Sequence, residues 1–321
     1  MEKPLGVIDA LYGGFALVFS RPWVLLIPIA VDLFLWMGPR VTAVPIFQQI
    51  ITWVGTSQPS NASPEMLQAF DAAKSAWLAA GNKFNVISVT ALVAIGMPTL
   101  MGLEVPSASF LQAPSTGLAI VDNTTFAGIV ALMVVMGILV GCLYLQTLAG
   151  GVHREENSAG TFATRTFKSY VSVGALIIAG CIIGFLIMLP FLLSAALVGI
   201  FDQNIASFLF LLGLMLLMWA ALYLSFAVPA IFVSGANLWQ AIVSSVTVFR
   251  YNFWSALGLV CLIYLIDVGF QIIWQSFEAT AWGALGADVA NAFLGSSLIA
   301  AMMLFYHDRI TWLNRIREQI R

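Results

Sequence analysis

Residues 170–201 read YVSVGALIIAGCIIGFLIMLPFLLSAALVGIF and contain no charged side chain. A helix that crosses the hydrocarbon core of a bilayer needs about 20 apolar residues, so this stretch is long enough to span it. The polar turn Asp202-Gln203-Asn204 follows, and a second uncharged stretch extends to residue 249. The two stretches predict a transmembrane helical hairpin, and the second is too long for a single span.

The composition of the whole chain agrees with a membrane location. Of its 321 residues, 61% are hydrophobic and 9% are charged, whereas a soluble protein has about 25% charged residues. Lipid must therefore be the solvent for much of the surface. The net charge of −2 gives no reason to expect nucleic acid or another strongly charged partner. We predict an all-α integral membrane protein.

Further apolar blocks predict the remaining spans. Two are uncharged, at residues 126–149 and 289–306, and two carry one acid each, at residues 22–38 and 252–277. The chain is therefore expected to form one membrane domain over residues 1–321 with six transmembrane helices. Their predicted ranges are 22–38, 126–149, 171–199, 205–233, 253–276 and 287–306.

The basic residues predict the orientation. The chain has 13 of them, and with the N-terminus inside only Arg40, Lys74 and Lys83 fall in outer segments, which leaves ten in cytoplasmic segments. Cytoplasmic loops of membrane proteins carry an excess of Lys and Arg. We therefore expect both termini in the cytoplasm of a bacterium, with the chain in its cytoplasmic (inner) membrane.

Three spans are each preceded by a short amphipathic segment, at residues 5–20, 157–169 and 237–250. A helix with one polar and one apolar face lies along the membrane surface more readily than it crosses the membrane. The sequence thus predicts three hairpins, each preceded by a cytoplasmic interfacial helix.

The first and last of these segments also match residue by residue. The matching pairs are Ala10/Ala241, Leu11/Ile242, Gly13/Ser244, Gly14/Ser245, Leu17/Val248, Val18/Phe249 and Trp23/Trp254. The middle segment matches in layout only. Internal repeats are common in transporters, but they also arise wherever a membrane hairpin is duplicated, so the meaning of the repeat stays open.

A family resemblance covers roughly residues 220–270. The residues that carry it are Val228-Pro229-Ala230, then Ala241 and Ser244, then Arg250, Asn252, Phe253 and Trp254. This pattern resembles a bacterial membrane domain that occurs alone, with unknown function, or attached to some glycerophosphodiester phosphodiesterases. The resemblance implies a helical membrane domain without catalytic residues, because the phosphodiesterase chemistry of that family resides in a separate soluble domain.

An insertion at residues 39–125 interrupts the first hairpin on the outer side. A helix is expected at residues 64–80, with Pro64 in its first turn. Residues 86–100 are apolar but too few for a span, and a span here would move several basic residues to the outside. We therefore expect residues 86–100 to be re-entrant or packed against the bundle.

Two acids lie well inside predicted spans, Asp32 and Asp267. A carboxylate in lipid is costly, so such residues are candidates for an ion or proton path. The alternative is that each is neutral or hydrogen-bonded to a neighbouring helix and only fixes the packing. Both interpretations remain open at this point.

The two histidines, His153 and His307, fall at the cytoplasmic ends of spans two and six. Imidazole ligates haem, and a haem or a pair of chlorophylls bridging them is the cofactor hypothesis that the sequence offers. Histidines beside charged residues at an interface are more often simply solvated. We expect no metal and no cofactor other than bound lipid.

Signatures of enzymes such as GxSxG, HExxH and the P-loop are absent from the sequence. We therefore expect a non-catalytic protein, a scaffold or accessory subunit that contacts other integral membrane proteins and lipids. The alternative is a small transporter or channel-like protein with Asp32 and Asp267 in its pathway. A membrane enzyme acting on lipid is the third possibility.

Overall fold

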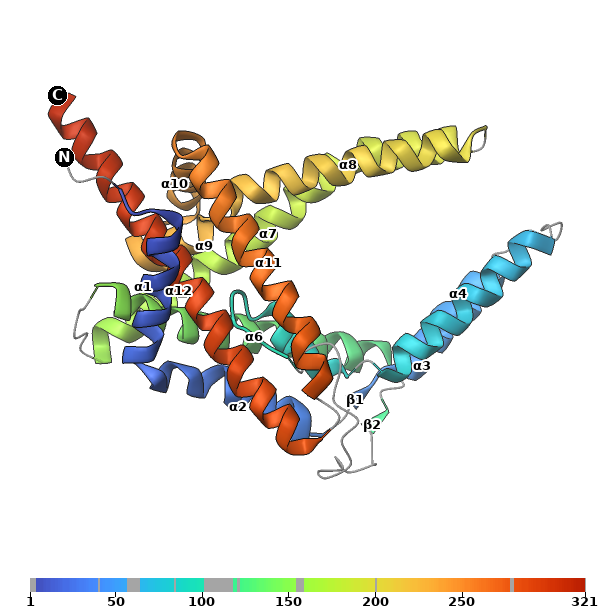
Figure 1. The fold of residues 1–321 in the computed structure, drawn as a ribbon. Helices are drawn as coiled ribbons and strands as arrows, with labels where there is room; N and C mark the ends of the chain where they lie inside the picture. The colour runs from blue at the N-terminus through green and yellow to red at the C-terminus, as the bar shows by residue number, and fades with distance from the viewer. Residues whose placement is uncertain are drawn as a thin grey trace. The chain divides into compact units, whose positions relative to one another are not determined.

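The computed structural model describes residues 4–39, 41–56, 64–83, 85–100, 118–119, 122–153, 159–199, 201–277 and 280–320. Nearly all of the described elements are helices (Figure 1). The chain divides into two compact units. Unit 1 comprises Met1–Val24, Leu145–Gly269 and Leu294–Arg321, and unit 2 comprises Leu25–Tyr144 and Phe270–Phe293. The single domain expected from the sequence is therefore built as two packing units.

The helices have the following bounds. Those that lie wholly within unit 1 are α1 (Val7–Ser20), α7 (Ala159–Val198), α8 (Gln203–Leu224), α9 (Ala227–Ser234) and α10 (Leu238–Tyr251). Those of unit 2 are α2 (Leu26–Met37), α3 (Val44–Thr56), α4 (Pro64–Lys83), the short 3₁₀ helix η2 (Val86–Ser88) and α5 (Val89–Val93). Three helices have residues in both units: α6 (Asn123–His153), α11 (Phe253–Phe277) and α12 (Ala281–Ile320).

Five described helical segments are long and apolar enough to cross a membrane. They are Asn123–Val152, Gly160–Val198, Gln203–Ser234, Phe253–Trp274 and Trp282–Ile316. The number rises to six if the interrupted pair Val7–Ser20 and Pro22–Met37 forms one span. The structure thus confirms the prediction of an all-α protein with several helices that are long and apolar enough to span a membrane.

The first predicted span, residues 22–38, is shorter in the structure than the others. It consists of a 3₁₀ turn at Pro22–Leu25 and α2, which has 12 residues. At a rise of 1.5 Å per residue, α2 is about 18 Å long, well below the roughly 30 Å of the hydrocarbon core. By itself α2 is too short to cross a membrane.

The predicted break between a middle surface helix and its span is absent. Helix α7 runs without interruption for 40 residues, from Ala159 to Val198. Neither Gly nor Pro stands between Ser169 and Val171, where the break was expected. Thr166 donates from its hydroxyl to the Phe162 carbonyl at 2.9 Å, within the same helix. Nothing in the local sequence therefore stops the helix there.

The first and last copies of the proposed repeat, α1 and α10, are alike in structure. At each N-terminus the backbone N–H before the helix donates to a side chain three residues later: Gly6 to Asp9 at 3.1 Å, and Asn237 to Gln240 at 3.2 Å. Three of the matched pairs are buried in both helices. These pairs are Ala10/Ala241, Gly14/Ser245 and Val18/Phe249. The similarity of α1 and α10 therefore extends from residues to packing.

Different residues end these two helices. After α1, Pro22 follows Arg21, and a proline disfavours helical backbone at the residue before it. After α10, Asn252 leaves the helical conformation, with φ −125° and ψ 35°, and its side-chain amide donates to the Val248 carbonyl at 3.3 Å. The middle copy has neither a proline nor an asparagine at this position, and α7 continues through it.

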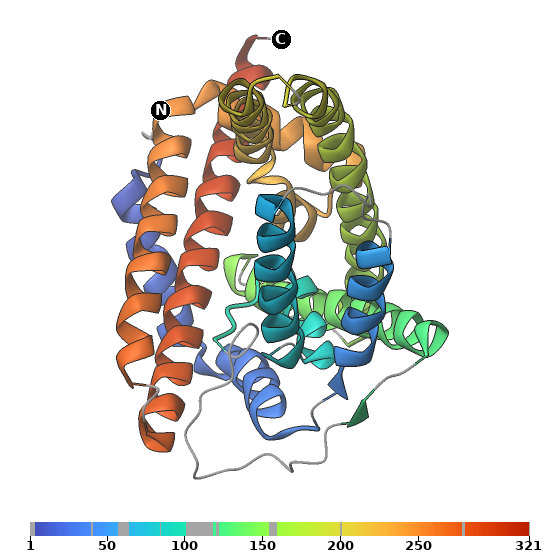
Figure 2. The ribbon, with the colours of Figure 1, turned by 90° about the vertical axis from the view of Figure 1, so that its right-hand side faces the viewer.

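In unit 1, α7 and α8 form a helical hairpin (Figures 1 and 2). Asp202 caps the start of α8 by accepting hydrogen bonds from the backbone N–H groups of Asn204, at 2.8 Å, and Ile205, at 3.3 Å. Gly213 is the only buried residue of α8, and a Cβ there would lie 2.9 Å from Phe191 of α7. The predicted polar turn at residues 202–204 thus begins the second helix.

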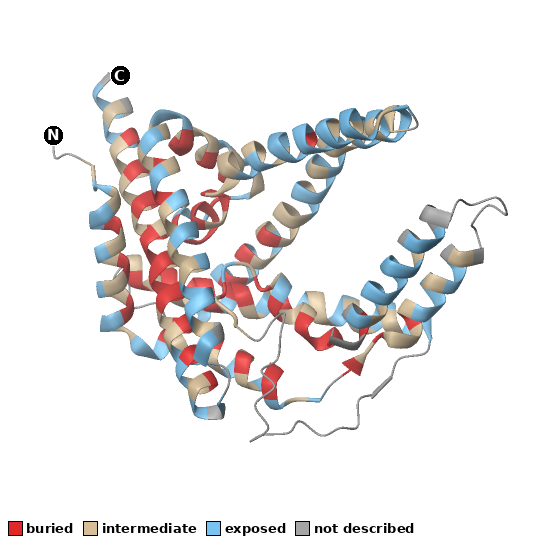
Figure 3. Cartoon of the chain, turned by 45° about the vertical axis from the view of Figure 1, so that its right-hand side comes forward, coloured by how far each residue is buried: buried red, intermediate tan, exposed pale blue. Residues whose placement is uncertain are grey.

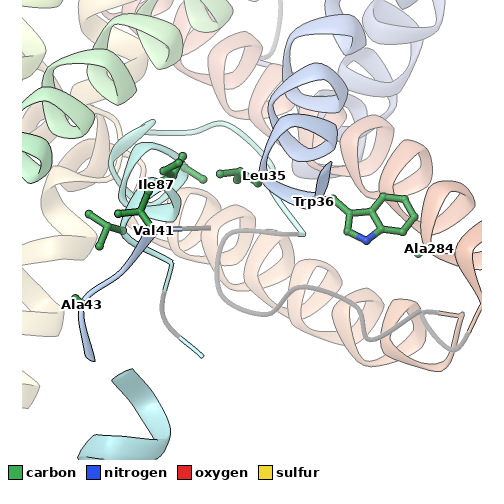
Figure 4. Close-up of a cluster of buried hydrophobic side chains, with 8 residues drawn as sticks. Leu35, Trp36, Val41, Ala43, Ile87 and Ala284 are labelled. Atoms are coloured by element: carbon green, nitrogen blue, oxygen red, sulfur yellow. The ribbon is translucent and has the colours of Figure 1, made fainter. Parts of the chain in front are cut away.

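The core of unit 2 contains a cluster of buried apolar side chains (Figure 4). Its members are Leu35, Trp36, Val41, Ala43, Val86, Ile87, Ala91 and Ala284. The strand β1 (Val41–Thr42) pairs in parallel with β2 (Leu118–Ala119). The buried Asn85 side chain fixes this region by accepting from the Val41 N–H at 3.0 Å and the Ile87 N–H at 3.2 Å.

Residues 86–100 contain the short helices η2 and α5 rather than one continuous helix. Val86 and Ala91 are buried. A Cβ on Gly137 of α6 would lie 2.4 Å from the Thr90 carbonyl oxygen, so α5 and α6 touch backbone to backbone. The segment is therefore packed against α6 within its unit.

The insertion at residues 39–125 also contains a second hairpin, made of α3 and α4 in unit 2. A helix was expected at residues 64–80, and α4 extends from Pro64 to Lys83. Trp77 of α4 meets Phe47 of α3 edge-to-face, with ring centroids 6.1 Å apart. The helix continues past Gly81, where a Cβ would lie 3.1 Å from Phe47.

Candidate functional sites: a buried acid pair and a basic cavity

Asp32 is 1% exposed in α2 of unit 2. Its carboxyl accepts hydrogen bonds from the Thr99 hydroxyl and, at 2.7 Å, from the backbone N–H of Leu100. Both donors come from the irregular end of the packed segment 86–100. Asp32 therefore holds that segment against α2.

The side chain of Asp288 of α12 lies within hydrogen-bonding reach of Asp32. Asp288 is 2% exposed, so this is a pair of buried acids. A carboxylate only accepts hydrogen bonds, so two carboxyl groups can bond to each other only when one of them carries a proton. The pair thus holds at most one negative charge while the hydrogen bond exists.

The surroundings of the acid pair are closed to solvent. The second oxygen of Asp288, Oδ1, is buried and makes no hydrogen bond within the described residues. A path for ions or protons needs carboxyl groups that reach water. The geometry is instead that of a polar contact which joins three segments of unit 2, namely α2, residues 99–100 and α12.

Sequence reasoning missed Asp288. It lies one residue before the uncharged block that begins at Val289, and so looks like a charge at the end of a span. The sequence did contain one signal, because Asn291, three residues later on the same helix, is also polar. In the structure both side chains are buried. The pairing with Asp32 joins distant parts of the chain, and the sequence carries no sign of it.

Asp267 is in a different setting from Asp32. It lies on α11 in unit 1 and is partly exposed, whereas Asp32 belongs to unit 2. The acids predicted from the sequence to share a pathway are therefore distributed over two packing units.

The histidine hypothesis gains no support from nearby ligands. His307 is partly buried in α12, and His153 is the last residue of α6, with a side chain outside the described part of the structure. Among the described residues, no group of three or more His, Cys, Asp or Glu side chains could hold a metal ion. A haem or chlorophyll bridge between the two histidines stays an untested hypothesis.

Unit 1 contains a cavity of about 300 Å³ between α6, α7 and the loop that joins α9 to α10. Arg165 and Lys168 of α7 line it, and none of the lining residues within the described part of the chain is acidic. Gln146 and Ser169 also line it and are 4% and 6% exposed. The cavity is thus basic and polar, although it lies beside apolar helices.

The loop on one side of the cavity depends on a glycine. Gly235 ends α9 in the left-handed conformation, with φ 61°, which a side chain would strain. The chain then turns directly into α10, whose cap residue Asn237 lines the cavity. In the sequence, Arg165 and Lys168 belong to the amphipathic segment at residues 157–169. The sequence could not show the cavity, because the lining residues come from three separate segments.

Comparisons with protein-family models, with curated proteins and with solved structures found no match. The resemblance over residues 220–270 therefore stays a prediction.

Proposed function

We propose that the protein is a non-catalytic scaffold or accessory subunit that binds other integral membrane proteins through the α7–α8 hairpin. It lies in the bacterial inner membrane with both termini in the cytoplasm. The orientation is supported by the excess of Lys and Arg in the segments assigned to the cytoplasm.

The observation that carries the proposal is that the chain leaves the α7–α8 hairpin largely uncovered. From Gly174 to Val198 no residue of α7 is buried. Figure 3 shows exposed and half-buried positions along both helices of the hairpin. Large apolar side chains such as Ile182, Phe185 and Leu193 are each more than half exposed. Other molecules must cover this surface in the membrane.

Two glycines favour a helix over lipid as the cover for part of this hairpin. Gly180 and Gly184 are four residues apart on α7, the spacing at which small residues let transmembrane helices approach closely. A Cβ on Gly184 would lie 3.4 Å from Leu217 of α8, whereas a Cβ on Gly180 would meet nothing within 4 Å. The position at Gly180 is therefore open to an apolar helix from another chain.

The acid pair supports a scaffold over the transporter alternative. Asp32 is sealed by Thr99, Leu100 and Asp288, which suits a packing role. A transport path through Asp32 would need these hydrogen bonds to open in each cycle.

The experiment is site-specific photo-crosslinking in intact membranes. A photoreactive amino acid at Ile183, which is 40% exposed near the glycine face, should give an adduct with a discrete protein. The matched control is Leu265 on α11, which is 69% exposed and should give lipid adducts only. Mass spectrometry of the adduct then distinguishes a second copy of this chain from another membrane protein.

A second variant tests whether the adduct depends on close helix approach. Gly180→Leu should remove the Ile183 adduct, and the fold should tolerate it because nothing within 4 Å would touch a Cβ there. The melting temperature of the purified variant checks that the fold is retained. Lipid adducts alone at Ile183, or a protein adduct that survives Gly180→Leu, would refute the proposed contact.

A further inference from the structure

Helix α10 presents an apolar, mostly aromatic stripe that the described residues leave uncovered. Trp239, Tyr251 and Trp254 are 74%, 67% and 81% exposed, and Val243 is exposed as well. The first, fifth and thirteenth residues of this run, Trp239, Val243 and Tyr251, lie along one side of α10. Trp254 follows in the first turn of α11. The opposite face of α10 is buried, so the stripe is the face of this helix that is open to a partner.

The neighbouring helices place both ends of α10 at one face of the membrane. Three residues separate α10 from the apolar segment Gln203–Ser234, and one residue separates it from Phe253–Trp274. Both segments are long and apolar enough to cross a membrane. Successive crossings run in opposite directions, so the first ends and the second begins at the same face. Helix α10 connects these two points.

Contacts within unit 1 place α10 beside the end of a span. Helix α8 has 22 residues and is about 33 Å long, close to the roughly 30 Å of the hydrocarbon core. Near the end of α8, Trp219 stacks on Phe253 of α11 with ring centroids 6.3 Å apart. Tyr223 lies against Phe249 of α10 at 4.8 Å, and its carbonyl accepts from the Ser245 hydroxyl at 2.7 Å. These contacts join α10 to the level at which α8 leaves the core.

The chemistry of the stripe fits the headgroup region of a bilayer. Trp and Tyr combine an apolar ring with an N–H or O–H group, and they are enriched where the membrane core meets water. Arg250 is exposed in the last turn of α10, and α10 contains no acidic residue. A basic residue at this level is attracted to anionic headgroups. Aromatic rings with one cation are thus suited to an anionic lipid surface.

The first copy of the repeat exposes side chains at the same positions. The exposed matched pairs, in the alignment that pairs Ala10 with Ala241, are Ile8/Trp239, Tyr12/Val243 and Trp23/Trp254. The repeat therefore includes an exposed apolar stripe as well as a buried face. Packing inside the protein explains the buried face only, and the exposed stripe requires a partner outside it.

We propose that the stripe formed by Trp239, Val243, Tyr251 and Trp254 docks on the headgroup region of an anionic bilayer, with Arg250 beside the lipid phosphates. This surface is separate from the contact proposed for the α7–α8 hairpin. It also does not depend on which face of the membrane is cytoplasmic.

The test measures the depth of spin labels on the purified full-length protein in vesicles of equal phosphatidylglycerol and phosphatidylcholine. In a background without the native cysteines, a single labelled cysteine replaces Val243 or Tyr251. Leu265 of α11, 69% exposed, is the reference for lipid, and the exposed Glu318 near the end of α12 is the reference for water. Collisions with oxygen and with a water-soluble nickel chelate report the depth. The melting temperature of each labelled protein checks the fold.

The labels at Val243 and Tyr251 should lie about 5–10 Å below the headgroup surface, deeper than Glu318 and shallower than Leu265. Values equal to those of Glu318 would overturn the lipid contact and leave the stripe to a soluble protein, since the vesicles contain no other protein. Values equal to those of Leu265 would place α10 in the hydrocarbon core and would also overturn the proposal.

A second arm tests the anionic lipid. Arg250→Gln should lower the ratio of immersed to water-exposed label at Val243 by about fivefold, the factor for one basic residue near an anionic surface. Vesicles of phosphatidylcholine alone should have the same effect on the unsubstituted protein. The matched control Arg315→Gln removes an exposed charge of α12 outside the stripe and should change nothing. Equal immersion in both lipid mixtures, or an equal loss in Arg315→Gln, would overturn the pairing of Arg250 with anionic headgroups.

Discussion

Asp32 and Asp288, from opposite ends of the chain, lie within hydrogen-bonding reach of each other inside unit 2, where each is at most 2% exposed. The two acids are not equivalent. Asp32 accepts two further hydrogen bonds, from Thr99 and Leu100, whereas Asp288 Oδ1 has no partner within the described residues. The stability of the fold should therefore depend more on Asp32 than on Asp288.

Asparagine at each position tests this difference. Asp32→Asn replaces one acceptor oxygen by an N–H donor, which would face either the Thr99 hydroxyl or the Leu100 N–H. Leaving a buried donor without an acceptor costs about 1–3 kcal/mol. Asp288→Asn can still donate to Asp32, so its effect should stay within about 1 kcal/mol. Thermal unfolding in detergent measures both, and an equal loss in the two variants would contradict this assignment.

Close packing of α1 on α12 makes a second prediction. A Cβ on Gly14 would lie 2.3 Å from the Ser297 carbonyl oxygen and 2.6 Å from the Ala301 nitrogen, both of them backbone atoms. Gly14→Ala should therefore force the helices apart and cost about 1–3 kcal/mol or more. The control is Gly258→Ala, where nothing lies within 4 Å, and it should be neutral or stabilising. Melting temperatures of the two variants compare them directly.

The start of α6 predicts a dependence on pH. Hydrogen bonds from the Thr124 hydroxyl and from Thr125 lower the pKa of the exposed Asp122 below its ordinary value of 3.8. Its contribution to stability is therefore complete above the unfolded pKa and is lost as the pH falls through the lower pKa of the folded state. Asp122→Ala should lower the melting temperature at neutral pH.

The measurement for Asp122 is the difference in melting temperature between the wild type and Asp122→Ala across a pH series. The difference should be constant from neutral pH down to about pH 5 and should shrink below about pH 4, where the unfolded carboxyl takes up its proton. A difference that grows on acidification would contradict the capping role of this carboxylate.

Cysteine labelling tests the proposed orientation. In a background without the native residues Cys142, Cys181 and Cys261, single cysteines replace Lys74 or Asn237, both exposed in the structure. An impermeant thiol reagent applied to the periplasmic side of cells with a permeabilised outer membrane should label position 74 and miss position 237. Disruption of the inner membrane should then expose position 237. Labelling of position 237 before the inner membrane is disrupted would contradict the proposed orientation.

The elements that could be predicted from sequence are those set by local composition. The uncharged stretch before Asp202 and the polar turn after it were enough to predict the α7–α8 hairpin, because both signals are continuous in the chain. The helix after Pro64 was likewise indicated by its own first turn. The similarity of α1 and α10 was also visible, since matching residues occupy matching buried positions.

The features that escaped prediction depend on distant residues or on the absence of a break. The role of Asp288 becomes visible only when the fold brings it beside Asp32. The cavity exists only when α6, α7 and the α9–α10 loop meet. The amphipathic pattern before residue 170 resembled that of α1, but it lacks the proline that ends α1 or the asparagine that ends α10. A polarity pattern predicts which face of a helix is exposed to water, but it does not predict where the helix ends.

The uninterrupted α7 has a consequence for the kind of bilayer that suits this protein. Its 40 residues measure about 60 Å, and its uncharged part, residues 170–198, measures about 44 Å. The hydrocarbon core is only about 30 Å thick, and transmembrane helices rarely tilt beyond about 40°. Even at that tilt, some apolar length would project from a bilayer of ordinary thickness. The hairpin therefore needs a strong tilt, a thicker bilayer or local thickening of the bilayer to keep its apolar length out of water.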